Sequence, residues 1–130
     1  MKRILKDSES PQITGALTGI TVVEFSEFIA GPYCSKLLAD MGAEVIKLES
    51  PGQGDITRRR PPFKGDRPGP DNSGLFFFLN ANKLSITLDP FHPAGKKAFF
   101  ELIAKADLLI EDRSPVVMEE AELDFKTMAR

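Results

Sequence analysis

The chain has 130 residues, 42% of them hydrophobic and 28% charged, and a formal net charge of −2. This length and composition predict a single globular domain and exclude a chain that is disordered throughout. The near-neutral charge gives no general attraction to nucleic acid or to an anionic membrane, so we expect neither as a partner. The single cysteine cannot form an internal disulfide, and no apolar run is long enough for a signal peptide or a membrane span; we therefore expect a cytoplasmic protein.

The first part of the chain predicts a strand, a helix and a second strand. Residues 1–16 are polar and without periodicity, and we expect a flexible N-terminal tail there. Gly19–Phe25 is rich in β-branched residues, as in a buried parallel strand. Pro32 suits the first turn of a helix that Gly42 ends, and Val45–Glu49 follows as the second strand. Four apolar side chains are expected to form the buried face of this helix: Tyr33, Leu37, Leu38 and Met41.

The next segments are a long loop and a run of phenylalanines. Ser50–Ser73 is rich in Pro and Gly, and a loop of this length without structure of its own is usually functional. Leu75–Leu79 contains three consecutive phenylalanines that need to be buried. If this segment is extended, neighbouring rings point to opposite sides, and one core cannot easily bury all three. We therefore expect the chain to associate with itself as a homodimer through an apolar patch.

The remaining segments continue the alternation of strands and helices. Ser85–Asp89 predicts a third strand, Pro93–Ala106 an amphipathic helix, Leu108–Glu111 a fourth strand, and Pro115–Met128 one or two short helices. The side chains expected on the inner face of the longer helix are Ala98, Phe99, Leu102, Ile103 and Ala106. The fold class is α/β: a Rossmann-like half-domain of about four mainly parallel strands with flanking helices, over residues 17–130.

Few side chains suggest chemistry by themselves. The turn at 30–32 is equally compatible with an anion site at a helix N-terminus and with a tight structural turn. Gly52-Gln53-Gly54 lacks the third glycine of a dinucleotide-binding motif, and the arginines at 58–60 are more often a solvated loop than a phosphate site. Cys34 is expected to be an inert core thiol, and His92 has no obvious partner. We therefore expect no metal site and no catalytic residue.

Several segments in register resemble the opening of the class III CoA-transferases. They are Leu17–Phe25 followed by Ala30-Gly31-Pro32, Leu38–Glu49, Gly52–Arg58, Leu79–Ser85 with Leu88-Asp89, and Ala106–Glu111. This family includes formyl-CoA:oxalate, carnitine and bile-acid CoA-transferases and α-methylacyl-CoA racemases. Its members are much longer and pair as interlocked chains, and their catalytic aspartate or His/Asp pair lies beyond the segment resembled here. The resemblance therefore implies a truncated N-terminal portion that is not catalytic alone.

The resemblance also implies where coenzyme A would be bound. The implied CoA-binding positions are Ile29, Ala30, Leu88, Asp89, Phe91, Asp112, Arg113 and Glu120. Four of them depart from the family pattern: Phe91 stands for a lysine, Asp112 for a neutral amide, Arg113 for an aromatic residue and Glu120 for an arginine. A reversed charge near a phosphate costs on the order of 1–3 kcal/mol. We therefore expect CoA binding to be weak or lost.

Three functions are compatible with these observations. The first is a non-catalytic N-terminal portion of a CoA-transferase. The second is one chain of a split CoA-transferase, completed by a partner chain that supplies the C-terminal part. The third is a small binding or interaction module that reuses the half-domain for another ligand or protein.

Overall fold

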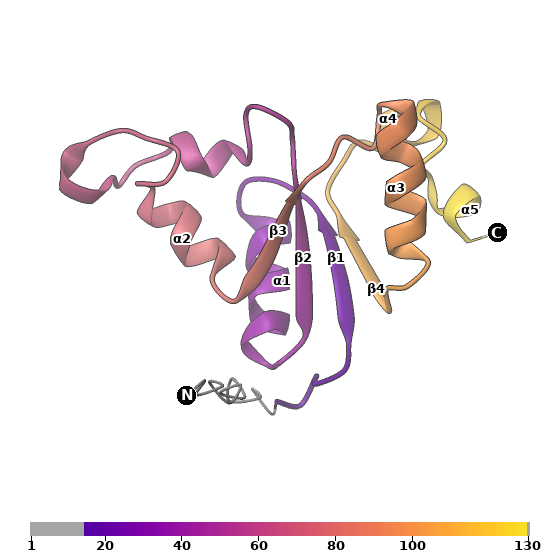
Figure 1. Ribbon diagram of the computed structural model, residues 1–130, viewed down its shortest axis with the longest axis horizontal. Helices are drawn as coiled ribbons and strands as arrows, with labels where there is room; N and C mark the ends of the chain where they lie inside the picture. The colour runs from indigo at the N-terminus through magenta and orange to yellow at the C-terminus, as the bar shows by residue number, and fades with distance from the viewer. Residues whose placement is uncertain (1–14, 130) are drawn as a thin grey trace, which may run out of the picture.

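The computed structural model describes residues 15–129 and consists of one parallel sheet with helices on both faces (Figure 1). The strands are β1 (Thr21–Phe25), β2 (Glu44–Glu49), β3 (Lys83–Thr87) and β4 (Leu108–Glu111). They lie in the order β3-β2-β1-β4, and each neighbouring pair is parallel. The predicted α/β class with four parallel strands is confirmed. Of the predicted tail, residues 1–14 lie outside the described part of the chain.

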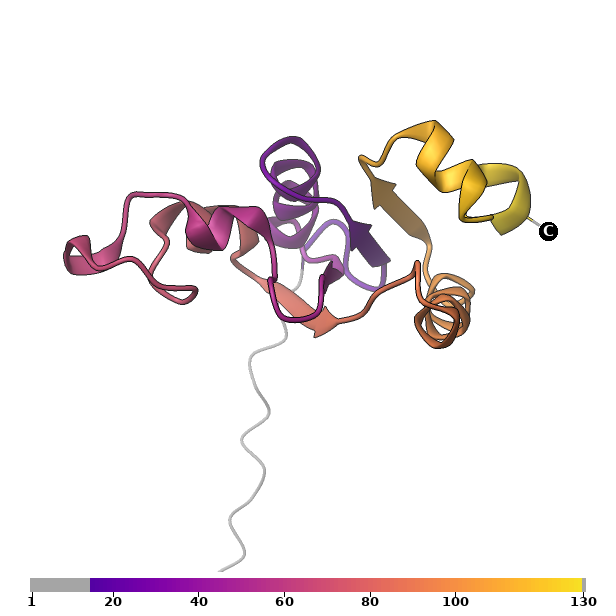
Figure 2. The ribbon, with the colours of Figure 1, turned by 90° about the horizontal axis from the view of Figure 1, so that it is seen from above.

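Helices connect the strands and cover both faces of the sheet. In chain order they are α1 (Ala30–Asp40), the short 3-10 helices η1 (Ile56–Arg59) and η2 (Lys64–Asp66), α2 (Gly74–Asn80), α3 (Pro93–Ile103), α4 (Pro115–Glu120) and α5 (Phe125–Met128). Figure 2 shows α1 and α3 on opposite sides of the sheet. Within residues 15–129, no helix has the length and apolar character needed to cross a membrane.

Alternating residues of β1 and β2 build a separate core on each face of the sheet. On the α1 face, Val22 and Val45 pack with Ala39 and Ala43. The core on the α3 face is larger and consists of Val23, Phe25, Leu48, Phe99, Met118 and Leu123. The carboxyl ends of the two central strands are thus held from both sides, which fixes the position of the turns that follow them.

The buried face of α1 differs from the one that the sequence predicted. Tyr33, Leu37 and Met41 are 44–45% exposed, whereas small residues, among them Ser35 and Ala39, face the sheet. The small residues let α1 lie close to the sheet, and the sheet beneath Ser35 carries a carboxylate instead of an apolar side chain. Cys34 is exposed as well, so its assignment as a core thiol was wrong.

The phenylalanine run is helical instead of extended. Ser73 caps α2, because its hydroxyl accepts the Phe76 amide at 3.1 Å and donates to the Arg60 carbonyl at 2.7 Å. Phe76 is buried, whereas Phe77 and Phe78 are 55% and 58% exposed. As expected, the three rings do not share one core. The reason is that consecutive residues of a helix point in different directions, and not that the segment is extended. In α3, Phe99 faces the core as predicted, and Ala98 is exposed.

Candidate functional site

A hollow of about 460 Å³ lies at the carboxyl ends of the strands, where open α/β sheets bind their ligands. Its lining comes from the segments that follow all four strands of the sheet. The lining residues are Glu27 after β1, Ser50, Pro51 and Gln53 after β2, Asp89 and Phe91 after β3, and Arg113 after β4. Its volume lies within the range of ordinary small-molecule sites.

Arg113 provides the positive charge in this hollow. Its guanidinium lies 4.9 Å from the ring centroid of Phe25, and Nη1 lies 3.4 Å from Oε2 of Glu27. The Nε atom is buried and has no hydrogen-bond partner among the described residues. Arg113 therefore lines the hollow with a guanidinium whose Nε is enclosed by the protein.

Phe91 provides an aromatic surface beside the arginine. Its ring packs against Phe25 with centroids 5.8 Å apart and remains 44% exposed. The Asp89 carboxylate accepts the Phe91 amide at 2.9 Å, which fixes the start of the turn after β3. The hollow therefore combines a half-exposed ring and a guanidinium with two carboxylates, those of Glu27 and Asp89.

Asp112 does not line the hollow. Its carboxylate accepts the Glu27 amide at 3.2 Å and so joins the turn after β1 to the end of β4. Burial of the carboxyl group, together with the nearby Glu27 charge, raises the pKa of Asp112, although the Glu27 amide and Arg113 oppose the shift. Asp112 therefore helps to position the segments that line the hollow, although it does not line the hollow itself.

The other predicted positions lie around the hollow. Ile29 and Ala30 are exposed where α1 begins, Leu88 packs against the core on the α3 face, and Glu120 is exposed at the end of α4. None of them belongs to the lining. The structure thus gathers Asp89, Phe91 and Arg113 from the predicted set. It adds Glu27, Ser50, Pro51 and Gln53, whose shared sequence signal is a position just after a strand.

Beneath the hollow, on the α1 face, lies a buried network of charges centred on Glu24. Lys47 and Lys83 donate to its two carboxylate oxygens at 2.7 and 2.8 Å, and Lys47 also lies 2.7 Å from Asp55. Burial alone would raise the pKa of Glu24, but the two lysines outweigh it and lower the pKa. Lys47 further donates to the Ser26 carbonyl at 3.1 Å, and this bond ties the turn after β1 to β2.

The turn at 30–32 is tightly packed against this network. A Cβ atom at Gly31 would lie 2.1 Å from the hydroxyl oxygen of Ser26. Glycine is therefore required for a close approach of the two segments. This packing favours the structural interpretation of the turn over the anion site.

The cationic loop is held by ion pairs. Arg58 donates to both oxygens of Glu49, from Nε at 2.6 Å and from Nη2 at 2.8 Å, and its guanidinium lies 3.7 Å from the Phe76 ring centroid. Arg59 donates to the Gln53 carbonyl at 2.7 Å. Burial opposes the shift, but the hydrogen bonds from Arg58 and Ser85 lower the pKa of Glu49 to about 2. Arg58 is thus a structural residue. Across the described residues, no cluster of His, Cys, Asp and Glu side chains is arranged to hold a metal ion.

Sequence comparison identifies the family. The model of CoA-transferase family III matches residues 17–130, nearly the whole chain. The chain belongs to CoA-transferase family III. It is 48% identical over 107 residues to a formyl-CoA:oxalate CoA-transferase of Bradyrhizobium diazoefficiens, covering 82% of this chain and 24% of the relative. It is 39% identical over 114 residues to a succinyl-CoA:mesaconate CoA-transferase of Haloarcula hispanica, covering 88% of this chain and 28% of the relative.

The solved structures agree with this assignment. A CAIB/BAIF family protein from Brucella suis superposes with a TM-score of 0.78 at 33% identity, over 88% of this chain and 30% of that one. The family III chain described here thus spans about a quarter of the length of its curated relatives. The matched quarter is an N-terminal portion, as the sequence indicated.

The lining of the hollow combines an aromatic surface with charges of both signs. The Phe91 ring is half-exposed there. The positive charge of Arg113 is already paired with Glu27, and Asp89 adds another carboxylate.

Proposed function

We propose that this chain forms the N-terminal, nucleotide-facing portion of a CoA-transferase and has no transferase turnover by itself. The observation that carries the proposal is the 48% identity to a formyl-CoA:oxalate CoA-transferase, confined to a stretch that is 24% of that enzyme. Such an identity supports a shared fold and site in this stretch. The chemistry belongs to the whole enzyme.

The side chains in the hollow give a reason to expect no turnover. Transfer of CoA between carboxylic acids needs a free carboxylate nucleophile that forms and releases an acyl intermediate. Glu27 is paired with Arg113, and Asp89 is hydrogen-bonded to the Phe91 amide. Both carboxylates therefore have partners within the fold, which supports the expectation that the nucleophile comes from the remaining three-quarters of the enzyme.

We expect the isolated chain to bind CoA weakly. Phe91 and Arg113 can hold the nucleoside, whereas Glu27 and Asp89 repel the phosphates. Calorimetry at low salt should give a dissociation constant no better than about 1 mM, or roughly −4 kcal/mol. The variant Phe91→Ala should weaken binding further, and Phe125→Ala, on a distant helix, is the matched control. A micromolar constant that Phe91→Ala does not change would place CoA elsewhere and contradict the assignment of the hollow.

Turnover assays test the other half of the proposal. Formyl-CoA and succinyl-CoA are suitable donors, because they appear in the names of the two relatives described above. We expect no transfer from the chain alone. Transfer that co-purifies with the chain, and that Glu27→Gln or Asp89→Asn abolishes, would show that a carboxylate of the hollow is a nucleophile after all.

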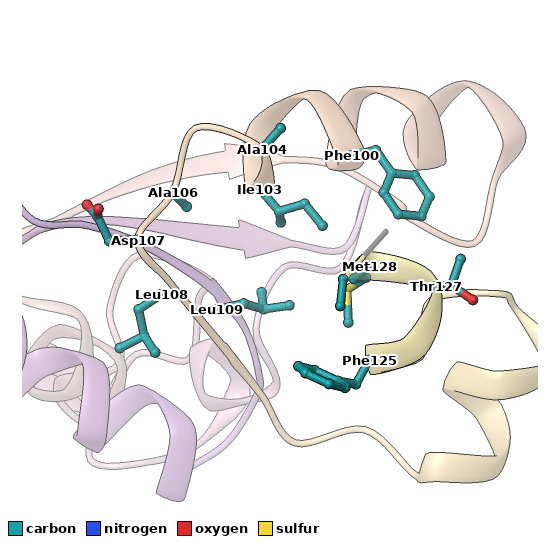
Figure 3. Close-up of a pocket in the computed structure, with 11 residues that line it drawn as sticks. Phe100, Ile103, Ala104, Ala106, Asp107, Leu108, Leu109, Phe125, Thr127 and Met128 are labelled. Atoms are coloured by element: carbon teal, nitrogen blue, oxygen red, sulfur yellow. The ribbon is translucent and has the colours of Figure 1, made fainter.

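A second candidate is one chain of a split enzyme, whose partner chain carries the C-terminal portion. Within residues 15–129 the outer edge of β4 pairs with no strand and lies beside apolar hollows (Figure 3), and this surface favours a partner chain over a free-standing binding module. Co-expression of this chain with the C-terminal portion of the Bradyrhizobium relative is the direct test. Recovery of transferase activity only when both are present is the expected result.

A further inference from the structure

The turn that joins β1 to α1 contains a residue with a strained backbone (Figure 1). Phe28 has a φ of 68°, in the left-handed region that a bulky side chain seldom adopts. Its ring is 47% exposed, so packing of the ring alone does not account for this conformation. Strained backbone persists only where the surrounding contacts determine it. We call residues 26–29 the β1 turn.

Hydrogen bonds hold the β1 turn from two sides. On the inner side, the Ser26 carbonyl accepts from Lys47 at 3.1 Å, and the Ser26 hydroxyl donates to Glu24 at 3.1 Å. These bonds belong to the buried charge network. On the outer side, the Glu27 amide donates to both carboxylate oxygens of Asp112, at 3.2 and 3.3 Å. Asp112 therefore holds the outer side of the turn.

The two sides differ in how easily they can be released. The side chains of Glu24 and Lys47 are buried and lie 2.7 Å apart. Asp112 remains in contact with solvent, and its bonds to the Glu27 amide are longer. Long hydrogen bonds at a solvated site open at a lower free energy than short buried ones. Release of the turn therefore begins at Asp112.

Glu27 couples the β1 turn to the hollow. Its carboxylate belongs to the lining and lies 3.4 Å from Nη1 of Arg113. A relaxed Phe28 would have a negative φ, and this rotation would carry Glu27 away from its present position. The conformation of the turn therefore decides whether the positive charge of Arg113 in the hollow is paired or unpaired.

We propose that the β1 turn is a strained gate, which Asp112 holds in the closed conformation so that Glu27 covers the Arg113 guanidinium. Asp112 is a positioning residue, because it contacts the Glu27 amide and does not line the hollow. The inference does not depend on the proposed function. It concerns this chain alone and stands whether or not coenzyme A is bound.

The charge of Asp112 gives the gate a distinctive pH dependence. Partial burial and the Glu27 charge raise the pKa of Asp112 above the 3.8 of an unperturbed aspartate. The Glu27 amide, Arg113 and Lys47 oppose this shift. The ionised carboxylate therefore lowers the stability of the fold, although it makes a stronger bond to the Glu27 amide than a protonated one. As the pH falls to 3.8, the stability penalty from Asp112 should disappear while the turn loosens.

Hydrogen exchange measured by NMR on the intact chain tests the gate. Asp112→Ala removes the acceptor, so exchange of the Glu27 amide at pH 7, relative to its intrinsic rate, should become at least tenfold faster. The proton on Arg113 Nε, which is buried in the closed conformation, should also exchange faster in this variant. Unchanged exchange at both positions would overturn the proposal.

Asp112→Asn separates the charge from the contact. It keeps a neutral acceptor, so exchange of the Glu27 amide at pH 7 should lie between wild type and Asp112→Ala, and should match wild type as the pH falls to 3.8. The melting temperature at pH 7 should rise in the same variant, because the unfavourable charge is gone. Glu120→Gln is the matched control, since it neutralises an exposed carboxylate at the end of α4. A melting temperature that falls together with the protection of Glu27 would give Asp112 a purely structural role and rule out the gate.

A double variant tests the strain at Phe28. Glycine adopts a positive φ without strain, so Phe28→Gly should keep the β1 turn closed with less help from Asp112. In this background, Asp112→Ala should change exchange of the Glu27 amide by at most about twofold. An effect as large as in the wild-type background would show that strain does not drive the opening, and would contradict the proposal.

Discussion

Titration of the buried Glu49 carboxylate should be detectable as a pH dependence of the free energy of unfolding. Hydrogen bonds from Arg58 and Ser85 hold its pKa at about 2, against 4.5 for an unperturbed glutamate. A lowered pKa gives stability that is complete above pH 4.5 and is lost as the pH falls toward 2. We therefore expect Glu49→Gln to lower the free energy of unfolding at pH 7 by about 2–3 kcal/mol.

Urea unfolding of the two proteins between pH 2 and pH 7 provides the measurement. The difference between wild type and Glu49→Gln should be largest above pH 4.5 and should shrink as the pH approaches 2. Glu44→Gln is the matched control, because Glu44 is exposed on the same strand and should change stability little. A constant difference at every pH would mean that the loss comes from packing and not from the ionised carboxylate.

At the same scale, the positions that the sequence predicted for CoA binding overlap only partly with the lining of the hollow. Asp89, Phe91 and Arg113, which were predicted through the family resemblance, line it. Glu27 and Gln53 were missed because nothing in their local sequence distinguishes them from loop residues. Their role depends on which turns meet at the sheet edge, and this follows only from the strand order.

At the scale of single elements, α2 allows a clean test of helix capping. The Ser73 hydroxyl accepts the Phe76 amide and is fully buried, whereas Ser114, which precedes α4, makes no such bond. Ser73→Ala should destabilise the fold by about 1–2 kcal/mol, because a cap and a buried hydrogen bond are both lost. Ser114→Ala should cost much less. Thermal unfolding of both variants measures the difference, and equal losses would show that the Ser73 bonds contribute nothing.

The strands were easier to predict than the helix faces. Runs of β-branched residues locate β1 and β2 to within a residue or two, because buried parallel strands need that composition. The buried face of α1 was wrong because the surface that it covers contains Glu24, so that Ser35 is turned inward and Tyr33 outward. An amphipathic pattern identifies the buried face only where the opposing surface is apolar.

At the scale of the whole molecule, the outer surfaces of α1 and α2 form an apolar patch. Tyr33 and Phe78 stack with ring centroids 6.4 Å apart, and Phe77 and Leu37 are exposed in the same two helices. Burying one phenylalanine is worth about 1.5–3 kcal/mol, and a small domain has only about 5–15 kcal/mol of stability in total. Covering this patch is therefore a large gain for the isolated chain.

We expect the isolated chain to form a dimer through this patch, with a mass near twice 14.3 kDa in sedimentation equilibrium at micromolar concentration. Phe78→Ser should shift the chain to monomer, since it removes the ring that stacks on Tyr33. Phe125→Ser, which changes a still more exposed ring in the hollow beside β4, should leave the dimer intact. A wild-type monomer, or a dimer that only Phe125→Ser dissociates, would mean that the α1 and α2 patch does not drive self-association.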